Sequence, residues 1–378
     1  MLRLGAAVTT SAAAAGVGRL PVPTSAASMG IPGVPLRVLA EKIGFTIGAP
    51  YWMRCQQCSE DPDLDAVLRR EFGQSILYHG WRSIEPQPGV RNFVQLNSWA
   101  GRYAKLGASR PILYGLVDPL GFDSTFGLPP WLKEKSRSQM IAALSAYVTD
   151  VVTYFKGKMS LIMVVGETNS APGWDWLYDV VGPEYVEIAF DAARKADPSV
   201  PLGYGDFSNQ MKWMKRYGAT KDIVDRLKRL RLIDAVILEG WMYAGNTDLG
   251  GMWPWRKDEI IEAFQSFELP VVISEFRVIL KDIKGSAEYR EDVQAQLFRL
   301  GLEAAIESGV CREVILGGPC DGPWDLATPS GTPSDMPNVF DSALRPKPAY
   351  YALQSVLQEA VARKYRFRRM GPLIASDR

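Results

Sequence analysis

Short apolar segments alternate with long amphipathic segments eight times along this chain, beginning near residue 40. Each apolar segment is bounded by turn-forming residues, a pattern typical of parallel strands buried on both faces. The expected strands are Gly44–Pro50, Ser75–His79, Pro111–Gly115, Leu161–Glu167, Pro201–Asp206, Ala235–Gly240, Val271–Phe276 and Val314–Gly318. The expected helices are Leu64–Phe72, Val94–Leu106, Ser138–Phe155, Pro183–Ala196, Lys221–Leu232, Lys257–Phe267, Ala287–Ser308 and Lys347–Tyr365. Eight βα units predict a single-domain α/β protein, a (β/α)8 TIM barrel.

The two ends of the chain are expected to lie outside this barrel, which we assign to residues 37–367. Residues 1–36 contain no acidic residue, carry Arg3 and Arg19 and are rich in Ala, Ser, Gly and Thr. This segment resembles an export signal, which would make the protein secreted or cell-surface, but a retained flexible extension fits equally well. Residues 368–378 form a C-terminal tail, and no strongly apolar run is long enough to predict a transmembrane segment.

Composition excludes several kinds of partner and cofactor. The 43 basic and 42 acidic residues leave a net charge of +1, so no overall field favours nucleic acid or an anionic membrane. One histidine, His79, rules out a multi-histidine metal site, and the CxxC of Cys55 and Cys58 lacks the second pair of a zinc ribbon. We expect no metal and no organic cofactor.

Most of the eleven tryptophans follow expected strands, at the barrel end where active sites form. Those at this rim are Trp52, Trp81, Trp131, Trp174, Trp176, Trp241, Trp253, Trp255 and Trp324. Flat aromatic side chains suit stacking against sugar rings. The alternative is that these indoles only cover the top of the barrel.

Two glutamates end strongly apolar strands. Glu167 closes LIMVVGE and Glu275 closes LPVVISE, the fourth and seventh expected strands, so both should point into one barrel mouth. A retaining glycosidase needs such a pair, with one carboxyl as proton donor and the other as nucleophile. A structural ion pair with Arg277 or Arg82 is the alternative interpretation.

Several stretches, in the correct order, resemble glycoside hydrolase family 10, the xylanase family of TIM-barrel enzymes. They are EKIGFTIGAP, EFGQSILYHGWRSIEPQPGVRNF, EYVEIAFDAARKADPSVPLGYGDFS, LPVVISEFRV and VFDSALRPKPAYYALQSVL, which together span about Arg37 to Leu357. The resemblance implies that Glu167 is the general acid/base and Glu275 the nucleophile of a double-displacement mechanism. Asp206, Asp321 and Trp324 also match the family pattern.

The same comparison of patterns predicts an altered sugar site. The family's asparagine before the acid/base is Gly166 here, and the asparagine before Asp206 is Gly205. The family's Asn and Lys after the second strand are missing from ILYHG, the histidines after the third strand are replaced within LYGLVDP, and its Gln-x-His at the sixth strand is Glu239-Gly240-Trp241. A site loses selectivity for hydroxyls when their hydrogen-bond partners vanish. We therefore expect a carbohydrate substrate other than standard xylan.

Seven residues are predicted to bind that substrate: Tyr78, His79, Trp81, Asp206, Glu239, Trp241 and Trp324. Glu239 could recognise a hydroxyl-rich or cationic sugar, or raise the pKa of the acid by like-charge repulsion, or be a surface carboxylate. His79 could bind sugar, or could be packed beneath Trp81 or bonded to backbone.

These observations favour a retaining glycoside hydrolase that cleaves a poly- or oligosaccharide. The alternative is a catalytically inactive carbohydrate-binding or structural assembly subunit on the same barrel.

Overall fold

Eight parallel strands form a ring in the computed structural model, which describes residues 31–51, 61–119, 127–168, 175–246, 251–252, 254–280, 283–322 and 336–367. The strands are β1 (Thr46–Gly48), β2 (Ile76–Tyr78), β3 (Ile112–Tyr114), β4 (Leu161–Gly166), β5 (Leu202–Asp206), β6 (Ala235–Leu238), β10 (Val271–Ile279) and β11 (Cys311–Leu316). They pair in the order β1-β11-β10-β6-β5-β4-β3-β2. A parallel bridge between Gly48 and Gln74 joins the two ends of this order and closes the barrel.

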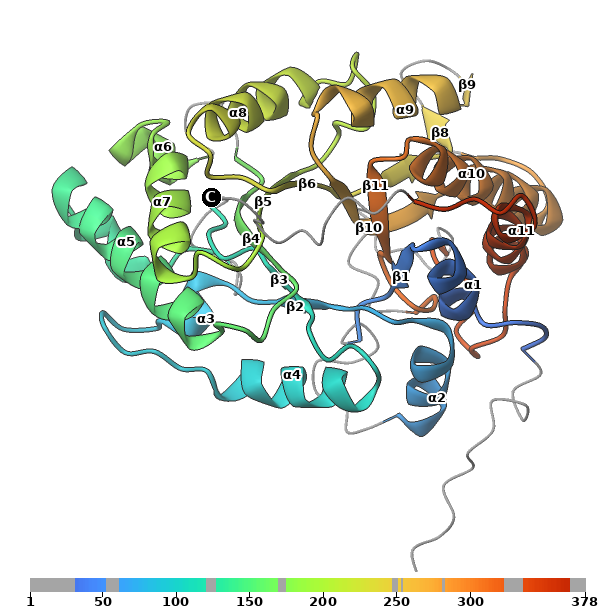
Figure 1. Cartoon of the computed structure of the whole chain (residues 1–378), viewed down its shortest axis with the longest axis horizontal. Coiled ribbons are helices and arrows are strands. Elements are labelled where there is room, and N and C mark those ends of the chain that lie inside the picture. The colour runs from blue at the N-terminus through green and yellow to red at the C-terminus, as the bar shows by residue number, and fades with distance from the viewer. Residues whose placement is uncertain are drawn as a thin grey trace, which may run out of the picture.

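Helices surround the ring (Figure 1). They are α1 (Leu36–Ile43), α2 (Pro62–Glu71), α3 (Trp81–Ile84), α4 (Val94–Lys105), α5 (Arg137–Tyr154), α6 (Trp176–Val181), α7 (Tyr185–Ala196), α8 (Tyr217–Arg229), α9 (Lys257–Ser266), α10 (Ala287–Glu307) and α11 (Pro348–Ala362), with a 3-10 turn η2 (Pro130–Glu134). The predicted strands and helices all form, with ends shifted by a few residues. The short helices α1, α3 and α6 and the η2 turn were not predicted, because one or two turns carry little periodicity.

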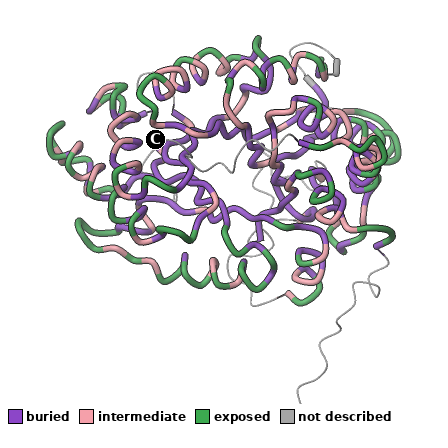
Figure 2. The backbone as a smooth tube through the Cα atoms, in the orientation of Figure 1, coloured by how far each residue is buried: buried purple, intermediate pink, exposed green. Residues whose placement is uncertain are grey.

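Side chains alternate between the two faces of each strand, and both faces are apolar. One set points into the barrel and forms a small inner core: Ile76, Ile112, Tyr114, Leu161, Met163, Ala235, Ile237, Val272 and Ile315. The other set packs against the helices in a larger outer core. The burial pattern follows, with buried residues along the ring and exposed residues on the outer helix faces (Figure 2). Both faces of the strands are therefore covered, as the apolar runs predicted.

The strand that carries Glu275 is longer than predicted. β10 continues past the expected end at Phe276 to Ile279, because β7 (Trp241–Tyr243) pairs in parallel with its second half. The register of β10 against β11 shifts between Ile273 and Phe276. Glu275 lies within this irregularity instead of at a strand end, and such irregularities re-aim side chains near active sites. A two-stranded antiparallel hairpin, β8 (Gly245–Asn246) and β9 (Gly251–Met252), follows β7.

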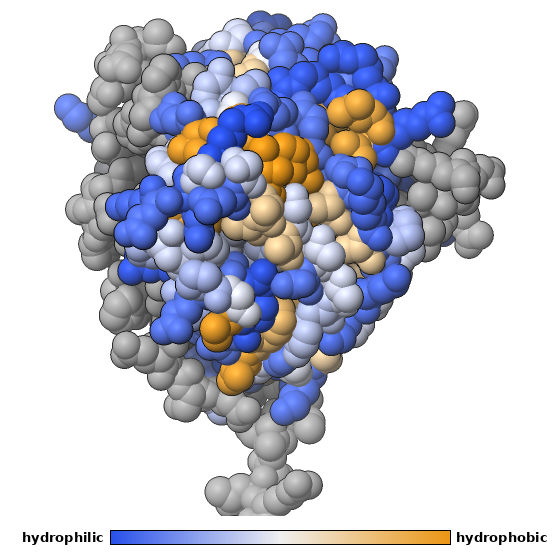
Figure 3. Space-filling view, turned by 90° about the vertical axis from the view of Figure 1, so that its left-hand side faces the viewer, coloured by the Kyte–Doolittle hydropathy of each residue, from blue (hydrophilic) through white to orange (hydrophobic). Residues whose placement is uncertain are grey.

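The outer surface carries no dominant apolar face on the side of α5 and α7. Figure 3 shows this side as mostly hydrophilic, with hydrophobic side chains in separate small groups. Within the described residues, no helix combines the length and apolar character that crossing a membrane requires.

Candidate active site

Acidic residues from four strands meet at the C-terminal mouth of the barrel. The backbone N–H of Glu167 donates to the carbonyl of Gly205 (3.0 Å), that of Glu239 donates to the carbonyl of Asp206 (3.2 Å), and that of Glu275 donates to the carbonyl of Glu239 (2.9 Å). These bonds link β4, β5, β6 and β10 in turn. The ladder of the sheet therefore holds the acidic residues at nearly one level around the rim, where TIM barrels place their chemistry.

The carboxylate of Glu275 is held from two sides. The Tyr78 hydroxyl donates to its Oε1 at 2.5 Å, and the indole Nε1 of Trp241 donates to its Oε2 at 3.1 Å. The guanidinium of Arg277 lies 3.9 Å from the same Oε2 and stands 5.2 Å from the centre of the Trp241 ring. The carboxylate is thus oriented by two donors and balanced by one cation, which suits an ionised nucleophile.

Arg277 is buried, with 2% of its surface exposed, and a glycine makes room for it. It donates a hydrogen bond to the carbonyl of Gly317, and a Cβ added at Gly317 would lie 1.9 Å from its Nε. Sequence reasoning considered Arg277 only as part of a structural ion pair. Its position, two residues beyond Glu275 on the same strand face, was the available signal for a role beside the carboxylate.

Glu167 is half-buried and has a backbone conformation that few residues other than glycine adopt. Its φ is 51°, in the left-handed region, where a residue other than glycine costs about 1 kcal/mol. Burial raises the pKa of Glu167 to about 8, with the negative charges of Asp118 and Glu275 acting in the same direction. Its carboxyl is therefore protonated at neutral pH and can act as a proton donor.

Glu239 is the third carboxyl of the cluster and is joined to Glu167 by a side-chain hydrogen bond. Only 7% of its surface is exposed. Burial, followed by the negative charges of Glu167 and Glu275, raises the pKa of Glu239 well above the usual range. The interpretation as a surface carboxylate does not fit this burial.

Asp206 is engaged by its own neighbours beneath the rim. Arg216 binds both carboxylate oxygens, with Nε 2.8 Å from Oδ1 and Nη2 3.0 Å from Oδ2, and the Tyr204 hydroxyl donates to Oδ2 at 3.1 Å. Arg216 also donates to the carbonyl of Thr168, the residue after Glu167. In this arrangement Asp206 acts through Arg216 to support the backbone that carries Glu167. Its predicted contact with substrate stays a prediction.

Tyr114, at the end of β3, belongs to the cluster although the sequence did not single it out. Its ring lies 4.9 Å from that of Tyr78, and its hydroxyl accepts a hydrogen bond from Ser274 at 3.3 Å. An aromatic residue at the end of a barrel strand, in the third expected segment, was the signal that could have found it.

His79 and Trp81 are both buried, and Trp81 makes its contacts away from the carboxyl cluster. Burial lowers the pKa of His79 to about 4, so its imidazole is neutral near pH 7. Trp81 stacks on Tyr147 with ring centres 4.4 Å apart and donates to Glu85 at 2.7 Å. The burial of His79 fits a packed side chain, its binding of sugar stays a prediction, and Trp81 lies in the core, not at the carboxyl cluster.

Several rim tryptophans cover the barrel instead of reaching the carboxylates. Trp131 donates to the backbone of Glu85 at 3.1 Å, and Trp255, 8% exposed, donates to the backbone of Tyr243 at 2.8 Å. Of those the structure describes, Trp241 contacts a catalytic candidate directly. Trp52, Trp174, Trp253 and Trp324 lie outside the described residues.

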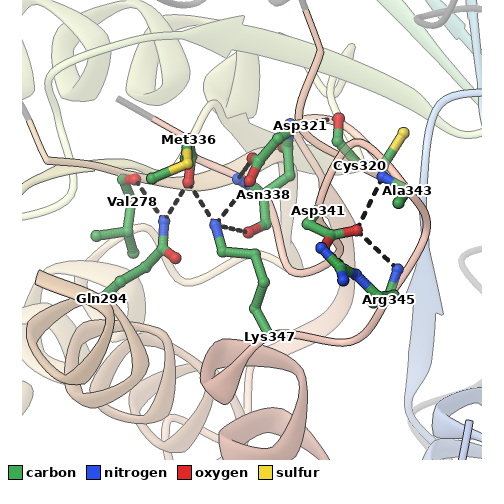
Figure 4. A network of polar contacts seen from close by, with 10 residues as sticks. All are labelled: Val278, Gln294, Cys320, Asp321, Met336, Asn338, Asp341, Ala343, Arg345 and Lys347. Carbon is green, nitrogen blue, oxygen red and sulfur yellow. Dashed lines mark hydrogen bonds and ion pairs between the residues drawn. The ribbon is translucent and has the colours of Figure 1, made fainter. Parts of the chain in front are cut away.

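A buried lysine holds together the chain around Asp321, after β11. The ammonium of Lys347 donates to the carboxylate of Asp321 at 2.8 Å and to the carbonyls of Met336 and Asn338 at 2.7 and 2.9 Å (Figure 4). Asn338 in turn donates its backbone N–H to Asp321 at 2.9 Å. Asp321 therefore has a structural role where the chain leaves β11.

The two glycines that replace the asparagines expected from the resemblance face one methionine. A Cβ at Gly166 would lie 1.8 Å from the Cε of Met163, and one at Gly205 would lie 2.5 Å from its Sδ. Gly166 and Gly205 are register partners on β4 and β5. An apolar side chain thus occupies the space that both polar side chains would need.

In the part of the chain that the structure describes, no group of three or more His, Cys, Asp or Glu side chains is arranged to hold a metal ion. The features present are a proton donor and an oriented carboxylate at the mouth of an α/β barrel. Together they define a glycoside hydrolase of the TIM-barrel class.

Comparison with known proteins agrees, and the chain belongs to glycosyl hydrolase family 10, whose sequence profile matches residues 125–356. It is 28% identical over 347 residues to endo-1,4-beta-xylanase B of Thermotoga neapolitana, covering 86% of this chain and 92% of that protein. It is 25% identical over 329 residues to endo-1,4-beta-xylanase A of Humicola insolens, covering 81% and 80% of the two chains. The crystal structure of xylanase 10B from Thermotoga maritima superposes with a TM-score of 0.75 at 25% identity, covering 87% of this chain and all of that one.

Proposed function

We propose that this protein is a retaining glycosidase in which Glu275 is the nucleophile and Glu167 the general acid/base. Glu275 attacks the anomeric carbon while Glu167 protonates the leaving oxygen, and Glu167 then takes a proton from the water that releases the sugar. The observation that carries this proposal is the pairing of a carboxylate held by Tyr78 and Trp241 with a second, protonated carboxyl on the same rim.

The substrate we propose is a carbohydrate related to β-1,4-linked xylan but differing from the unsubstituted polymer. The named relatives are endo-1,4-beta-xylanases, and one similar structure, xylanase 10B from Thermotoga petrophila, contains xylobiose. Met163, packed against Gly166 and Gly205, offers no hydrogen bond to a sugar hydroxyl at this point. A sugar in which a substituent shields or replaces that hydroxyl would therefore lose less binding free energy at this point than unsubstituted xylose does.

A panel of substrates with active-site variants tests the proposal. Xylan, substituted xylans, other plant, algal and bacterial polysaccharides and aryl glycosides would be incubated with the wild type, Glu167→Ala and Glu275→Ala. We expect the wild type to hydrolyse at least one of these substrates. The rate of that hydrolysis should be at least 1,000-fold lower in Glu275→Ala. 1H NMR should show that the first product keeps the anomeric configuration of the substrate. Glu262→Gln, at a side chain that is 66% exposed, is the control and should be unaffected.

The outcomes separate this proposal from the others. An inverted product would exclude double displacement, and preference for unsubstituted xylan would exclude the altered substrate. A folded protein that binds glycans without hydrolysing any member of the panel would favour the inactive binding or assembly subunit.

A further inference from the structure

We propose that Glu239 and Glu167 form a proton-sharing carboxyl pair, in which Glu239 stays protonated and donates its hydrogen bond to Glu167. Glu239 is then a positioning residue for the acid/base and does not itself contact the reacting atoms. This inference rests on the proposed function for its catalytic consequence, but the pair itself can be measured without any substrate.

The backbone brings the two side chains to the same point of the rim. Glu167 directly follows β4, and its backbone N–H bonds to Gly205 of β5. Glu239 directly follows β6, and its backbone N–H bonds to Asp206 of β5, so only β5 lies between the two residues. Glu239 is buried, Glu167 is half-buried, and a side-chain hydrogen bond joins their carboxyls. Two carboxyls in contact require a proton between them, because two carboxylates have no hydrogen to share.

The two arginines at this rim pair with carboxylates other than Glu167 and Glu239. Arg216 pairs with Asp206 at 2.8 Å, and Arg277 lies 3.9 Å from Glu275. Across the described ranges, no ion pair involves Glu167 or Glu239. A buried carboxyl with no cation beside it retains its proton, since burial penalises the charged form.

The surrounding carboxylates also favour the protonated pair, and Arg216 opposes them. Those whose charges act on or respond to the pair are Asp118, Asp206, Glu275, Tyr78, Tyr114, Tyr243 and Arg216. The carboxylates among them disfavour a further negative charge, and the three tyrosines are neutral near pH 7 because burial raises the pKa of each. The two carboxyls differ in exposure, because Glu239 is buried with 7% of its surface exposed whereas Glu167 is half-buried. The more deeply buried carboxyl retains its proton more firmly, which identifies Glu239 as the donor.

Such a donor serves both halves of a double displacement. In the first step the proton of Glu167 passes to the glycosidic oxygen, the bond from that oxygen to the anomeric carbon breaks, and Glu275 bonds to the carbon. The O–H of Glu239 then stabilises the Glu167 carboxylate. In the second step water attacks the carbon, its proton returns to Glu167, and the bond to Glu275 breaks. Glu239 keeps its proton throughout and lets Glu167 alternate between acid and base.

Carboxyl titration by 13C NMR tests the pair directly, using protein labelled at the glutamate side-chain carboxyls. We expect two resonances, lost respectively in Glu167→Gln and Glu239→Gln, to stay protonated at pH 6. Replacing Glu239 with leucine removes the donor and should raise the pKa of Glu167 by about one unit. Glu239→Gln keeps an uncharged donor, the amide N–H, and should leave that pKa within about half a unit.

The reciprocal variant keeps the test decisive if Glu239→Leu does not fold. Glu167→Gln removes the neighbouring charge and should lower the pKa of Glu239 by about one unit or more. A Glu239 carboxyl that titrates below pH 5 in both the wild type and Glu167→Gln would overturn the proposal. So would a Glu167 titration that is unchanged in folded Glu239→Leu.

Kinetics then connect the pair to turnover. On whichever substrate the panel identifies, the alkaline limb of kcat/KM should move upward by about one pH unit in Glu239→Leu, and kcat should fall about tenfold. Glu239→Gln should restore the wild-type limb and most of kcat, a rescue that a purely structural role would not predict. If the titrations show the carboxyl pair but no substrate is hydrolysed, the pair is supported and the proposed function is rejected. If a substrate is hydrolysed but both carboxyls titrate with ordinary pKa values, the proposed function is supported and the pair is rejected.

Discussion

At the scale of single residues, Met163 determines which side chains its neighbours can carry. It is 1% exposed and belongs to the core inside the barrel, yet its far end lies where β-carbons of residues 166 and 205 would begin. Methionine is flexible and fills irregular gaps, so it can occupy the space of two lost polar side chains. The glycines and the methionine are therefore best understood as one coupled set.

This coupling predicts a non-additive pair of substitutions. Gly166→Asn alone should destabilise the protein by about 2 kcal/mol, because the new side chain overlaps Met163. In a protein that already carries Met163→Ala, Gly166→Asn should cost less than half of that amount, since the alanine vacates the space. Denaturant unfolding of the two single variants and the double variant measures the coupling. Additive effects would show that the two positions do not compete for space.

A second residue-scale prediction concerns Glu313, in the barrel wall. It is the register partner of Thr46 and Val272 and lies two residues from Ile315, so it points into the barrel, far from the mouth. Burial raises the pKa of Glu313 to about 7, with a hydrogen bond from Gln74 opposing the shift. The native protein thus binds this proton more tightly than the unfolded chain, whose carboxyl has an ordinary pKa.

The sign of the resulting pH dependence follows from linkage. The stability contributed by this proton is complete below pH 4.5 and is lost as the pH rises to about 7, because the unfolded chain releases the proton first. At pH 8 the free energy of unfolding of Glu313→Gln should therefore exceed that of the wild type by about 2 kcal/mol. Denaturant unfolding at several pH values measures this gain in stability, which should shrink toward pH 4. A gain that is equal at pH 4 and pH 8 would contradict the assignment.

At the scale of elements, Lys347 ties the start of α11 to the chain that follows β11. Its ammonium makes three hydrogen bonds, and its side chain is 5% exposed against 8% for its ion-pair partner Asp321. A buried ion pair of this kind contributes mainly by what is left behind when one partner is removed. This connection joins the two described segments that flank residues 323–335.

The ion pair predicts an asymmetric response to substitution. Lys347→Met should cost about 3 kcal/mol, because it leaves the Asp321 carboxylate buried without its cation. The double variant with Asp321→Asn should be more stable than Lys347→Met alone, since no buried charge remains. Lys195→Met, at an i,i+4 pair whose lysine is 75% exposed, should change stability by less than about 0.5 kcal/mol. Chemical denaturation of the three variants measures these differences, and equal losses for Lys347→Met and Lys195→Met would refute the structural role.

At the scale of the whole molecule, closure of the barrel depends on a narrow contact between its first and second strands. Besides the Gly48–Gln74 bridge, the backbone N–H of Ala49 donates to Gln74 at 3.1 Å, and that of Gly73 donates to Ile47 at 3.0 Å. The first described residues meet the last helix nearby, because Gln354 of α11 donates to the carbonyls of Pro32 and Val34 (3.2 and 3.0 Å). Figure 1 accordingly shows α1 beside α11.

Glycine at position 48 is what permits this closure. A Cβ there would lie 2.5 Å from the backbone oxygen of Gln74 and 2.6 Å from the Cδ1 of Ile315. Gly48→Ala should destabilise the protein by about 2 kcal/mol or more, because a backbone atom cannot move aside as a flexible side chain can. Gly101→Ala, at an open position of α4, should instead be neutral or slightly stabilising. Thermal unfolding distinguishes the two variants. An unchanged midpoint for Gly48→Ala would show that the contact between β1 and β2 can adjust to the added methyl group.

The barrel and the two leading glutamates could be predicted because each depends on local pattern. Apolar strands that recur eight times leave few ways to bury both faces, and a carboxylate at the end of such a strand is conspicuous. Residues whose role depends on their neighbours were harder to place. Arg277 and Tyr114 were not assigned to the site, and Trp81 was placed at the rim although its indole packs on Tyr147. Whether a side chain near a strand end faces the mouth or the helices depends on the local turn, which periodicity does not specify.

By itself, the sequence determined the number and order of the βα units, because hydrophobic periodicity is a property of consecutive residues. It also determined which carboxyls follow directly on an apolar run. Only the tertiary structure decided how those carboxyls interact, because hydrogen bonding and burial depend on residues that are distant in the chain. Tyr78 reaches Glu275 across 197 positions, Met163 fills the space above two glycines, and Glu239 meets Glu167 across an intervening strand. The charge state of the site is set by these contacts, since burial and neighbouring charges shift a pKa more than residue type does.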